Sequence, residues 1–207
     1  MFKGNSLYLV LTGECCNGRD PLLIAKEAAL EGVDIIQMRE KNIPKSGLAE
    51  YGAKLKLICS ENKVIFIVND DPYLAGSLNA DGVHLGQEDL IETPVKIVRE
   101  ILGDKIIGIS THSLEQFEKA NNEDFDYIAF GPIFYTKTKD YHIGMKDVEV
   151  VLAKATKPVV FIGGINKTNV QELVKKGAKN IAMIRAITES DNIGETIKYF
   201  KKKLNIH

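Results

Sequence analysis

Residues 64–89 read VIFIVNDDPYLAGSLNADGVHLGQED, and this stretch decides the fold class. Residues 64–68 form a continuous apolar run rich in β-branched and aromatic side chains, which predicts a fully buried strand. The run stops at Asn69, Asp70 and Asp71, a short helical segment follows, and a second strand over 82–85 ends at a similar polar group that closes with Asp89. If these strands are parallel neighbours ~4.8 Å apart, Asp70 and Asp89 can reach one point.

Two carboxylates at one point repel each other unless a cation or a proton lies between them. A hard divalent ion such as Mg²⁺ suits ligands that are all oxygen. Taken one at a time, Asp70 and Asp89 are better explained as helix N-caps, where aspartate is common. The repetition of the arrangement after two successive strands favours a shared metal site.

The same alternation of apolar strands and helices extends through the whole sequence. Strands are predicted over 7–11, 33–38, 64–68, 82–85, 105–110, 127–130, 159–162 and 180–184. Helices are predicted over 21–30, about 44–60, the region of 95–102, about 114–120, near 146–155, 167–176 and 194–203, with a short one after Asp71. Continuous apolar strands are typical of parallel sheets covered on both faces. We therefore expect one (β/α)8 TIM barrel over residues 1–207. The alternative is an open doubly wound sheet, but no GxGxxG or Walker loop supports it.

Composition agrees with one soluble domain. The 207 residues match the size of a single α/β barrel. Hydrophobic residues make up 44% and charged residues 27%, and the net charge is -1, so no global charge favours nucleic acid or an anionic membrane. No apolar segment reaches the ~18 residues of a membrane span, and no signal-peptide core follows the start, which predicts a cytoplasmic protein. Three cysteines indicate no disulfide framework, and the sequence does not indicate an oligomeric state.

Residues at the predicted strand ends supply the candidate site, because active sites of this fold lie where the loops after the strands converge. These residues are Gln37, Arg39, Lys41, Asn69, Asp70, Asp89, Ser110, Thr136, Lys139, Gly163, Gly164 and Arg185. Lysine and arginine offer donors to phosphate oxygens. The two glycines would let the backbone approach a ligand, and a helix N-terminus just beyond them would offer N–H groups to an anion.

Each of these signals also has an ordinary structural explanation. Gly163-Gly164 is also compatible with a simple tight turn, and Arg39 with Glu40 is compatible with a solvated ion pair. His84, in the middle of a short strand, is better explained as a packed or hydrogen-bonded histidine than as a catalytic base. The loop over 131–144 is too long to be only a connector.

Several ordered motifs resemble those of the thiamine phosphate synthase family. They are QMREK at 37–41, VNDD at 68–71, DGVHLGQED at 81–89, GISTHS at 108–113, GPIFYTKTKD at 131–140 and IGGI at 162–165. The resemblance implies a transferase that joins hydroxymethylpyrimidine diphosphate to a thiazole phosphate, which is carboxylated in many bacteria, and releases pyrophosphate. It implies a dissociative reaction, in which a pyrimidine carbocation forms before the thiazole nitrogen captures it.

The resemblance also implies a role for each matching residue. Asp70 and Asp89 would hold Mg²⁺, while Arg39, Lys41, Asn69 and Lys139 would bind pyrophosphate. Gln37 would help to hold the pyrimidine, and Ser110 would lie beside the reacting centre. Thr136, Thr138, Gly164, Ile184 and Arg185 would face the thiazole phosphate. Ser110, Lys139, Arg39 and Lys41 are the expected catalytic residues.

Two departures from the family pattern stand out. Arg185 replaces a small serine, so that an extra cation either strengthens the phosphate site or fills it, and the segment 140–148 is shorter than the usual loop. Two rivals remain: a thiazole tautomerase and a non-catalytic barrel that binds a thiamine precursor. The tautomerase branch tends to lose the lysine and the Asn-Asp pair that this chain keeps as Lys41, Asn69 and Asp70. That branch also has a histidine where this chain has Pro132.

Overall fold

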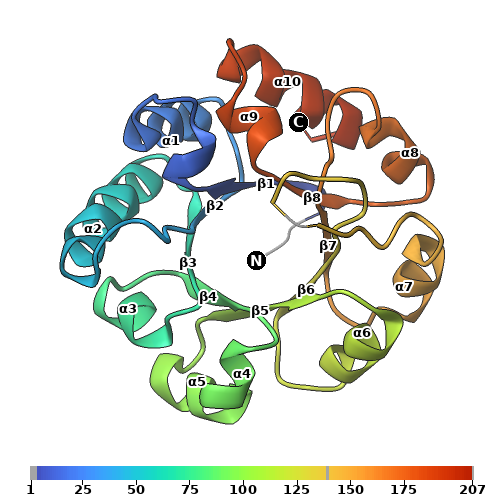
Figure 1. Cartoon of the computed structure of the whole chain (residues 1–207), viewed down its shortest axis with the longest axis horizontal. Helices are drawn as coiled ribbons and strands as arrows, with labels where there is room; N and C mark the ends of the chain where they lie inside the picture. Colours follow the sequence, from blue (N-terminus) through green and yellow to red (C-terminus); the bar gives the residue numbers. More distant parts are fainter. Residues whose placement is uncertain (1–3, 139, 207) are drawn as a thin grey trace.

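A closed barrel of parallel strands forms the centre of the computed structural model, which describes residues 4–138 and 140–206. In this part of the chain eight strands pair in sequence order, and β1 pairs with both β2 and β8 (Figure 1). The strands are β1 Ser6–Leu11, β2 Ile35–Met38, β3 Ile65–Asn69, β4 Gly82–Leu85, β5 Ile106–Thr111, β6 Tyr127–Phe130, β7 Val159–Ile162 and β8 Asn180–Met183. The predicted (β/α)8 barrel is confirmed.

Helices surround the barrel on its outside (Figure 1). They are α1 Pro21–Leu30, α2 Lys45–Glu61, α3 Pro72–Ser77, α4 Asp89–Glu92, α5 Val95–Leu102, α6 Leu114–Asn121, α7 Val148–Lys154, α8 Val170–Lys175, α9 Arg185–Thr188 and α10 Ile193–Leu204, with a 3-10 turn, η1, at Gly13–Cys15. Side-chain caps begin several of them: Asp20 accepts the N–H of Leu22 at α1, and Ser113 accepts that of Gln116 at α6. The short α4 and α9 were not predicted, because four residues are too few to display a helical period.

The hydrophobic core lies in two layers on either side of the strands. Alternate residues of β1 illustrate this, since Leu7, Leu9 and Leu11 pack outward with the helices while Tyr8 and Val10 pack inside the barrel. The inner layer also contains Tyr127, whose hydroxyl needs a partner inside the barrel. The barrel interior therefore combines apolar packing with a polar centre.

The long loop after β6 folds back against the loop after β7. Ile133 N–H donates to the carbonyl of Ile162 at 2.9 Å, and Phe134 N–H donates to that of Gly163 at 3.0 Å. A Cβ atom at Gly163 would lie 2.3 Å from Cβ of Pro132, and one at Gly164 would lie 2.2 Å from the carbonyl oxygen of Tyr135. Both glycines also have positive φ. The close approach of this loop therefore requires glycine at both positions. From sequence, the two glycines were related to a ligand, and this contact between loops was not predicted.

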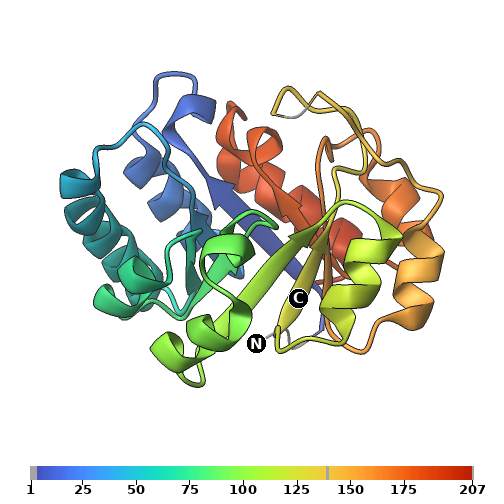
Figure 2. The same cartoon turned by 60° about the horizontal axis from the view of Figure 1, so that its bottom comes forward.

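The loops after the strands share one end of the barrel, which we call the mouth. In Figure 2 the loop after β6, in yellow, and the loop after β1, in blue, both lie at the upper end. The helix predicted over 167–176 begins at Val170, and the N–H groups of Asn166 and Thr168 are bonded by the side chains of Asn169 and Asn166. A helical turn does begin shortly after Gly164, since the N–H of Val170 donates to the carbonyl of Asn166 at 3.0 Å. The N–H groups of Asn166 and Thr168 already have acceptors within this turn, so they are not the free donors that were expected for an anion. Within the described residues, no helix is long and apolar enough to cross a membrane.

Candidate active site

A cavity of about 500 Å³ opens at the mouth of the barrel. Its wall is formed by strand ends and by the loops that follow β5, β6, β7 and β8. Of the residues predicted from sequence, the wall includes Gln37, Arg39, Asn69, Ser110, Thr136, Thr138, Gly163, Gly164, Ile184 and Arg185. Residues from almost every part of the sequence therefore meet at one cavity, as the strand-end pattern predicted.

Asp70 and Asp89, which we call the acidic pair, face each other at the mouth. Their carboxyl groups are hydrogen-bonded, and burial, together with the negative charge of Asp89, raises the pKa of Asp70 to about 6. Lys41 and Arg39 lie close enough to oppose this rise. Asp89 is also held by the N–H of Gly86, which donates to its Oδ2 at 2.6 Å. The predicted convergence of two carboxylates is confirmed.

Neither member of the acidic pair is a helix N-cap. Asp71 has that role at α3, where its side chain accepts the N–H of Leu74 at 2.9 Å, and Glu88 is the N-cap position of α4. Asp70 instead has a φ of 66°, a left-handed conformation that is uncommon outside glycine. Local backbone strain of this kind clusters at functional sites.

The acidic pair fits a Mg²⁺ ion by its chemistry. Its donors are carboxylate oxygens, and Mg²⁺ is usually held by one or two carboxylates while water and substrate phosphates complete its shell. Within residues 4–138 and 140–206, no group of three or more His, Cys, Asp or Glu side chains is arranged to hold a metal by itself. A metal here would therefore depend on the anion of a substrate as well as on the protein.

Two arginines bring buried N–H groups to the cavity wall. Arg39 forms a 3.7 Å ion pair with Glu14, yet its buried Nη1 makes no hydrogen bond with the described residues. Arg185 pairs through Nη1 with Glu189, and its buried Nε likewise has no hydrogen-bond partner there. Glu40 does not pair with Arg39 as a solvated ion pair would, because its Oε1 accepts the N–H of Gly13 at 2.8 Å. Both guanidinium groups keep donors for an anion.

Five polar side chains, which we call the inner network, are joined by hydrogen bonds beneath the cavity. Gln37 Nε2 donates to Tyr8 Oη at 2.9 Å, and the hydroxyls of Tyr8 and Tyr127 lie 3.0 Å apart. His84 joins Nδ1 to Tyr127 Oη at 2.7 Å and Nε2 to Ser110 Oγ at 2.8 Å. Burial, reinforced by His112, lowers the pKa of His84 to about 4. The prediction that His84 is a hydrogen-bonded histidine is confirmed.

Sequence reasoning missed two members of the inner network and part of the cavity wall. Tyr8 and Tyr127 were taken as ordinary strand residues, since a hydrophobic run does not reveal which side chains face the barrel interior. His112, Asn166 and Glu189 line the cavity. The positions of His112 just after β5 and of Asn166 shortly after Gly164 were an available signal, whereas Glu189 follows α9 and carried no such signal. Lys139, predicted to bind pyrophosphate, lies outside the described residues.

Comparison with known proteins gives a consistent result. A family model described as thiamine monophosphate synthase matches residues 7–187. The thiamine-phosphate synthase of Persephonella marina is 39% identical over 199 residues, covering 95% of this chain and 94% of the relative. That of Fusobacterium nucleatum is 36% identical over 206 residues, covering 98% of each.

A solved structure, the thiamine phosphate pyrophosphorylase of Pyrococcus furiosus, superposes with a TM-score of 0.87 at 32% identity and covers 97% of this chain and 95% of its own. The family match spans β2 to β8 in full and β1 from its second residue, together with the acidic pair and all but the last residue of the cavity wall. The chain belongs to the thiamine monophosphate synthase family.

Proposed function

We propose that this chain is a Mg²⁺-dependent transferase that joins hydroxymethylpyrimidine diphosphate to a thiazole phosphate and releases pyrophosphate, forming thiamine phosphate. The acidic pair is the observation that carries the proposal, since two carboxyl groups that interact with each other lie close to Arg39 and Lys41 at the barrel mouth. The names of the relatives support the same reaction. Only small molecules are expected as partners, and we include a cytoplasmic location in the proposal.

The diphosphate end of the substrate would bind at the acidic pair. Asp70 and Asp89 would hold Mg²⁺, which when bound neutralises charge on the departing pyrophosphate. Arg39, Lys41 and Asn69 would donate to the phosphate oxygens, and Lys139 is assigned the same role from the family motif. The buried Nη1 of Arg39 supports this assignment, because its long ion pair with Glu14 gives it no hydrogen bond among the described residues, and a buried N–H group is costly until an anion accepts from it.

The two ring systems would occupy the rest of the cavity. Gln37 would help to hold the pyrimidine, and Ser110 would lie beside its reacting carbon. Thr136, Thr138, Gly164, Ile184 and Arg185 would face the thiazole phosphate, and all of them lie on the cavity wall. Arg185 is among the residues that line the cavity, whereas Asp70 and Asp89 are not, which supports separate sites for the two phosphate groups.

The chain's contribution would be positioning and electrostatic stabilisation. In a dissociative reaction the bond to pyrophosphate breaks before the thiazole nitrogen attacks, so no strong base has to remove a proton first. His84 fits this view, since both of its ring nitrogens are engaged in hydrogen bonds and burial keeps it neutral. Ser110, Arg39, Lys41 and Lys139 are the proposed catalytic residues.

The rival functions have less support. A thiazole tautomerase would have no need of the Asp70, Asn69 and Lys41 set, and the relatives reported above carry the synthase name. A non-catalytic binding barrel would require Arg185 to fill the site. However, Arg185 is paired with Glu189 on the wall, and a cavity of about 500 Å³ is present beside it.

Pyrophosphate release tests the proposal directly. The purified chain is mixed with both substrates and Mg²⁺, and release is followed with time, with parallel reactions that omit one substrate or contain a chelator. We expect release only in the complete mixture. Turnover of the thiazole compound alone would favour the tautomerase, and binding of either substrate without release would favour the non-catalytic barrel.

A further inference from the structure

The inner network runs across the barrel from one side of the cavity wall to the other. Its members come from β1, β2, β4, β5 and β6, and the two end members, Gln37 and Ser110, line the cavity together with His84. Tyr8, Gln37, His84 and Tyr127 are buried, with exposed fractions of 8% or less. A buried polar group without a partner is costly, so all four bonds are expected to be made at once.

The direction of each hydrogen bond follows from the chemistry of its donor. The amide Nε2 of Gln37 can only donate, so Tyr8 Oη accepts from it and gives its own proton to Tyr127. Tyr127 Oη then donates to Nδ1 of His84. A neutral imidazole that accepts at Nδ1 carries its proton on Nε2, so Nε2–H donates to Ser110 Oγ.

The bond directions fix which end of the network donates a hydrogen bond toward the cavity and which end accepts one. Ser110 Oγ accepts from His84, so its hydroxyl proton is directed to another acceptor, and the Oε1 of Gln37 remains as an acceptor on the opposite wall. Reversing the Gln37 amide would reverse all four bonds together. The network therefore has two possible senses, and the amide orientation selects one of them.

We propose that Tyr8, Tyr127 and His84 are positioning residues, which make Ser110 a hydrogen-bond donor and Gln37 an acceptor toward the bound ring. The cavity then selects a heteroaromatic ring that offers an acceptor nitrogen to Ser110 and a donor, such as an amino group, to Gln37. The identity of this ring as the pyrimidine rests on the proposed function. The three positioning residues act through Ser110 and Gln37 and need not touch the ring themselves.

The tautomer of His84 tests the sense of the network without any substrate. Nitrogen-15 NMR of the histidine-labelled chain at neutral pH should show His84 protonated at Nε2 and bare at Nδ1. His112 provides an internal control, because its Nδ1 lies 2.5 Å from the carbonyl oxygen of Gly131 and must carry the proton there. His84→Asn and His112→Asn each remove one set of signals and assign the spectrum. A proton on Nδ1 of His84 would overturn the proposal.

Tyr127→Phe tests the consequence for the substrate, since it removes one hydroxyl and leaves the ring in place. We expect kcat/KM for the pyrimidine diphosphate to fall about tenfold, with KM for the thiazole phosphate unchanged. We also expect His84 to populate both tautomers and the variant to discriminate less between the amino pyrimidine and its oxo analogue. Tyr199→Phe, which loses a hydroxyl bonded to the carbonyl of Lys167 at 3.0 Å outside the cavity, should change none of these values.

An equal change in both KM values, or an unchanged His84 tautomer, would mean that Tyr127 serves packing only and would overturn the proposal. If Tyr127→Phe does not fold, Tyr8→Phe interrupts the same network between Gln37 and Tyr127. The same changes in kcat/KM and in the His84 tautomer are expected for it. Absence of pyrophosphate release by the unmodified chain would instead refute the proposed function, while the His84 tautomer would still decide the sense of the network.

Discussion

The two ends of the barrel use charge in opposite ways. At the amino-terminal end, Asp34, Asp81 and Asp126 immediately precede β2, β4 and β6, and each accepts a backbone N–H of the preceding strand at 2.8 Å. Lys56 pairs with Asp81 at 3.1 Å and Arg99 with Asp126 at 2.9 Å. At the mouth, like charges face each other in the acidic pair, and Arg39 and Arg185 keep buried N–H groups that make no hydrogen bond within the described part of the chain.

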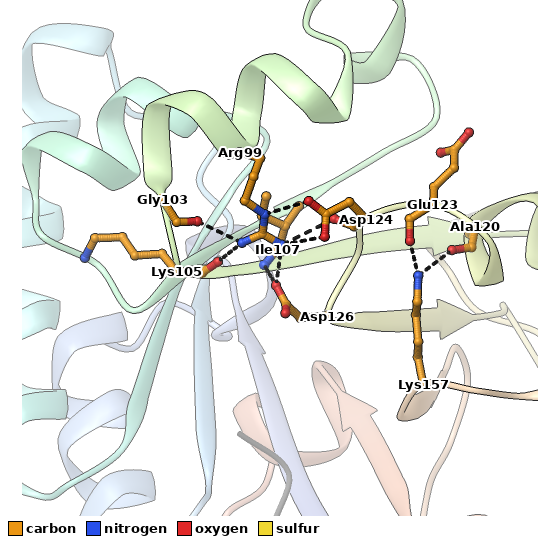
Figure 3. A network of polar contacts seen from close by, with 9 residues as sticks. All are labelled: Arg99, Gly103, Lys105, Ile107, Ala120, Glu123, Asp124, Asp126 and Lys157. Carbon is orange, nitrogen blue, oxygen red and sulfur yellow. Dashed lines mark hydrogen bonds and ion pairs between the residues drawn. The ribbon is translucent and has the colours of Figure 1, made fainter.

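Arg99 illustrates how completely a cation can be satisfied at the amino-terminal end (Figure 3). Its Nε donates to Asp124, its Nη1 to the carbonyls of Gly103 and Lys105, and its Nη2 to Asp126. Lys157 nearby donates to the carbonyls of Ala120 and Glu123. Charges that are fully hydrogen-bonded hold strands and loops together. Arg39 and Arg185 at the mouth have glutamate partners, yet each keeps a buried N–H group that makes no hydrogen bond with the described residues and is available to a ligand.

The largest expected effect of this difference is at Asp70. Asp70→Ala should reduce pyrophosphate release about 100-fold or more, because one charge that would hold Mg²⁺ beside the leaving group is lost. The free energy of unfolding should not fall, since the change removes repulsion from Asp89. Steady-state release and urea unfolding of the same preparations measure the two quantities.

Asp71 is the matched control for that experiment. Asp71→Ala removes the N-cap of α3 and should cost about 1 kcal/mol of stability with little effect on turnover per folded molecule. Undiminished release by Asp70→Ala, or an equal loss of activity in both variants, would contradict the assignment of Asp70 to the site.

Asp126 should give the reverse result. Asp126→Ala leaves the N–H of Ile107 without its acceptor and removes the nearest acceptor of Arg99 Nη2, which should lower the free energy of unfolding by about 2 kcal/mol and leave kcat unchanged. Glu118→Ala is the control, because the Lys154–Glu118 pair is exposed and holds no backbone N–H, so its loss should cost less than about 0.5 kcal/mol. Similar losses of stability in the two variants would show that the aspartates before the strands stabilise the fold no more than an exposed ion pair does.

Arg185 tests whether the two substrates bind at different ends of the cavity. Arg185→Ser should raise KM for the thiazole phosphate about tenfold and leave KM for the pyrimidine diphosphate unchanged, because one charge-assisted donor is lost at one end of the cavity. Glu189→Gln removes the anion that now pairs with Arg185 and should lower the same KM. An equal effect of Arg185→Ser on both substrates would mean that Arg185 does not serve the thiazole end.

The sequence predicted the barrel and the position of most site residues because both depend on strand ends. Each apolar run stops where a parallel strand ends, and all such ends meet at the mouth, so Asp70 and Asp89 could be brought together across 19 residues without knowing any side-chain geometry. The bounds of β4, β6, β7 and α1 agree with the predicted ranges for the same reason.

Other features depend on information that periodicity does not contain. Strands covered on both faces hide which residues point inward, so Tyr8 and Tyr127 could not be assigned to the inner network. The role of Gly163 and Gly164 depends on the path of the loop after β6, which is not local in sequence. The aspartates before β2, β4 and β6 recur in the sequence, but their backbone partners lie in the preceding strands.

The smallest expected effect is the pH dependence of stability at the acidic pair. Because burial and Asp89 raise the pKa of Asp70 to about 6, the folded chain binds more protons than the unfolded chain between pH of about 4 and about 6. This contribution to stability is therefore present at low pH and is lost as pH rises through about 6. Asp70 is only partly desolvated and keeps an exposed side, so solvent screens the interaction and we expect about 1 kcal/mol. In urea unfolding with a chelator, Asp70→Asn should be more stable than the unmodified chain at pH 7.5 by that amount and equal to it near pH 4, and added Mg²⁺ should stabilise only the unmodified chain. A difference that is the same at both pH values would mean that Asp70 and Asp89 do not interact in solution.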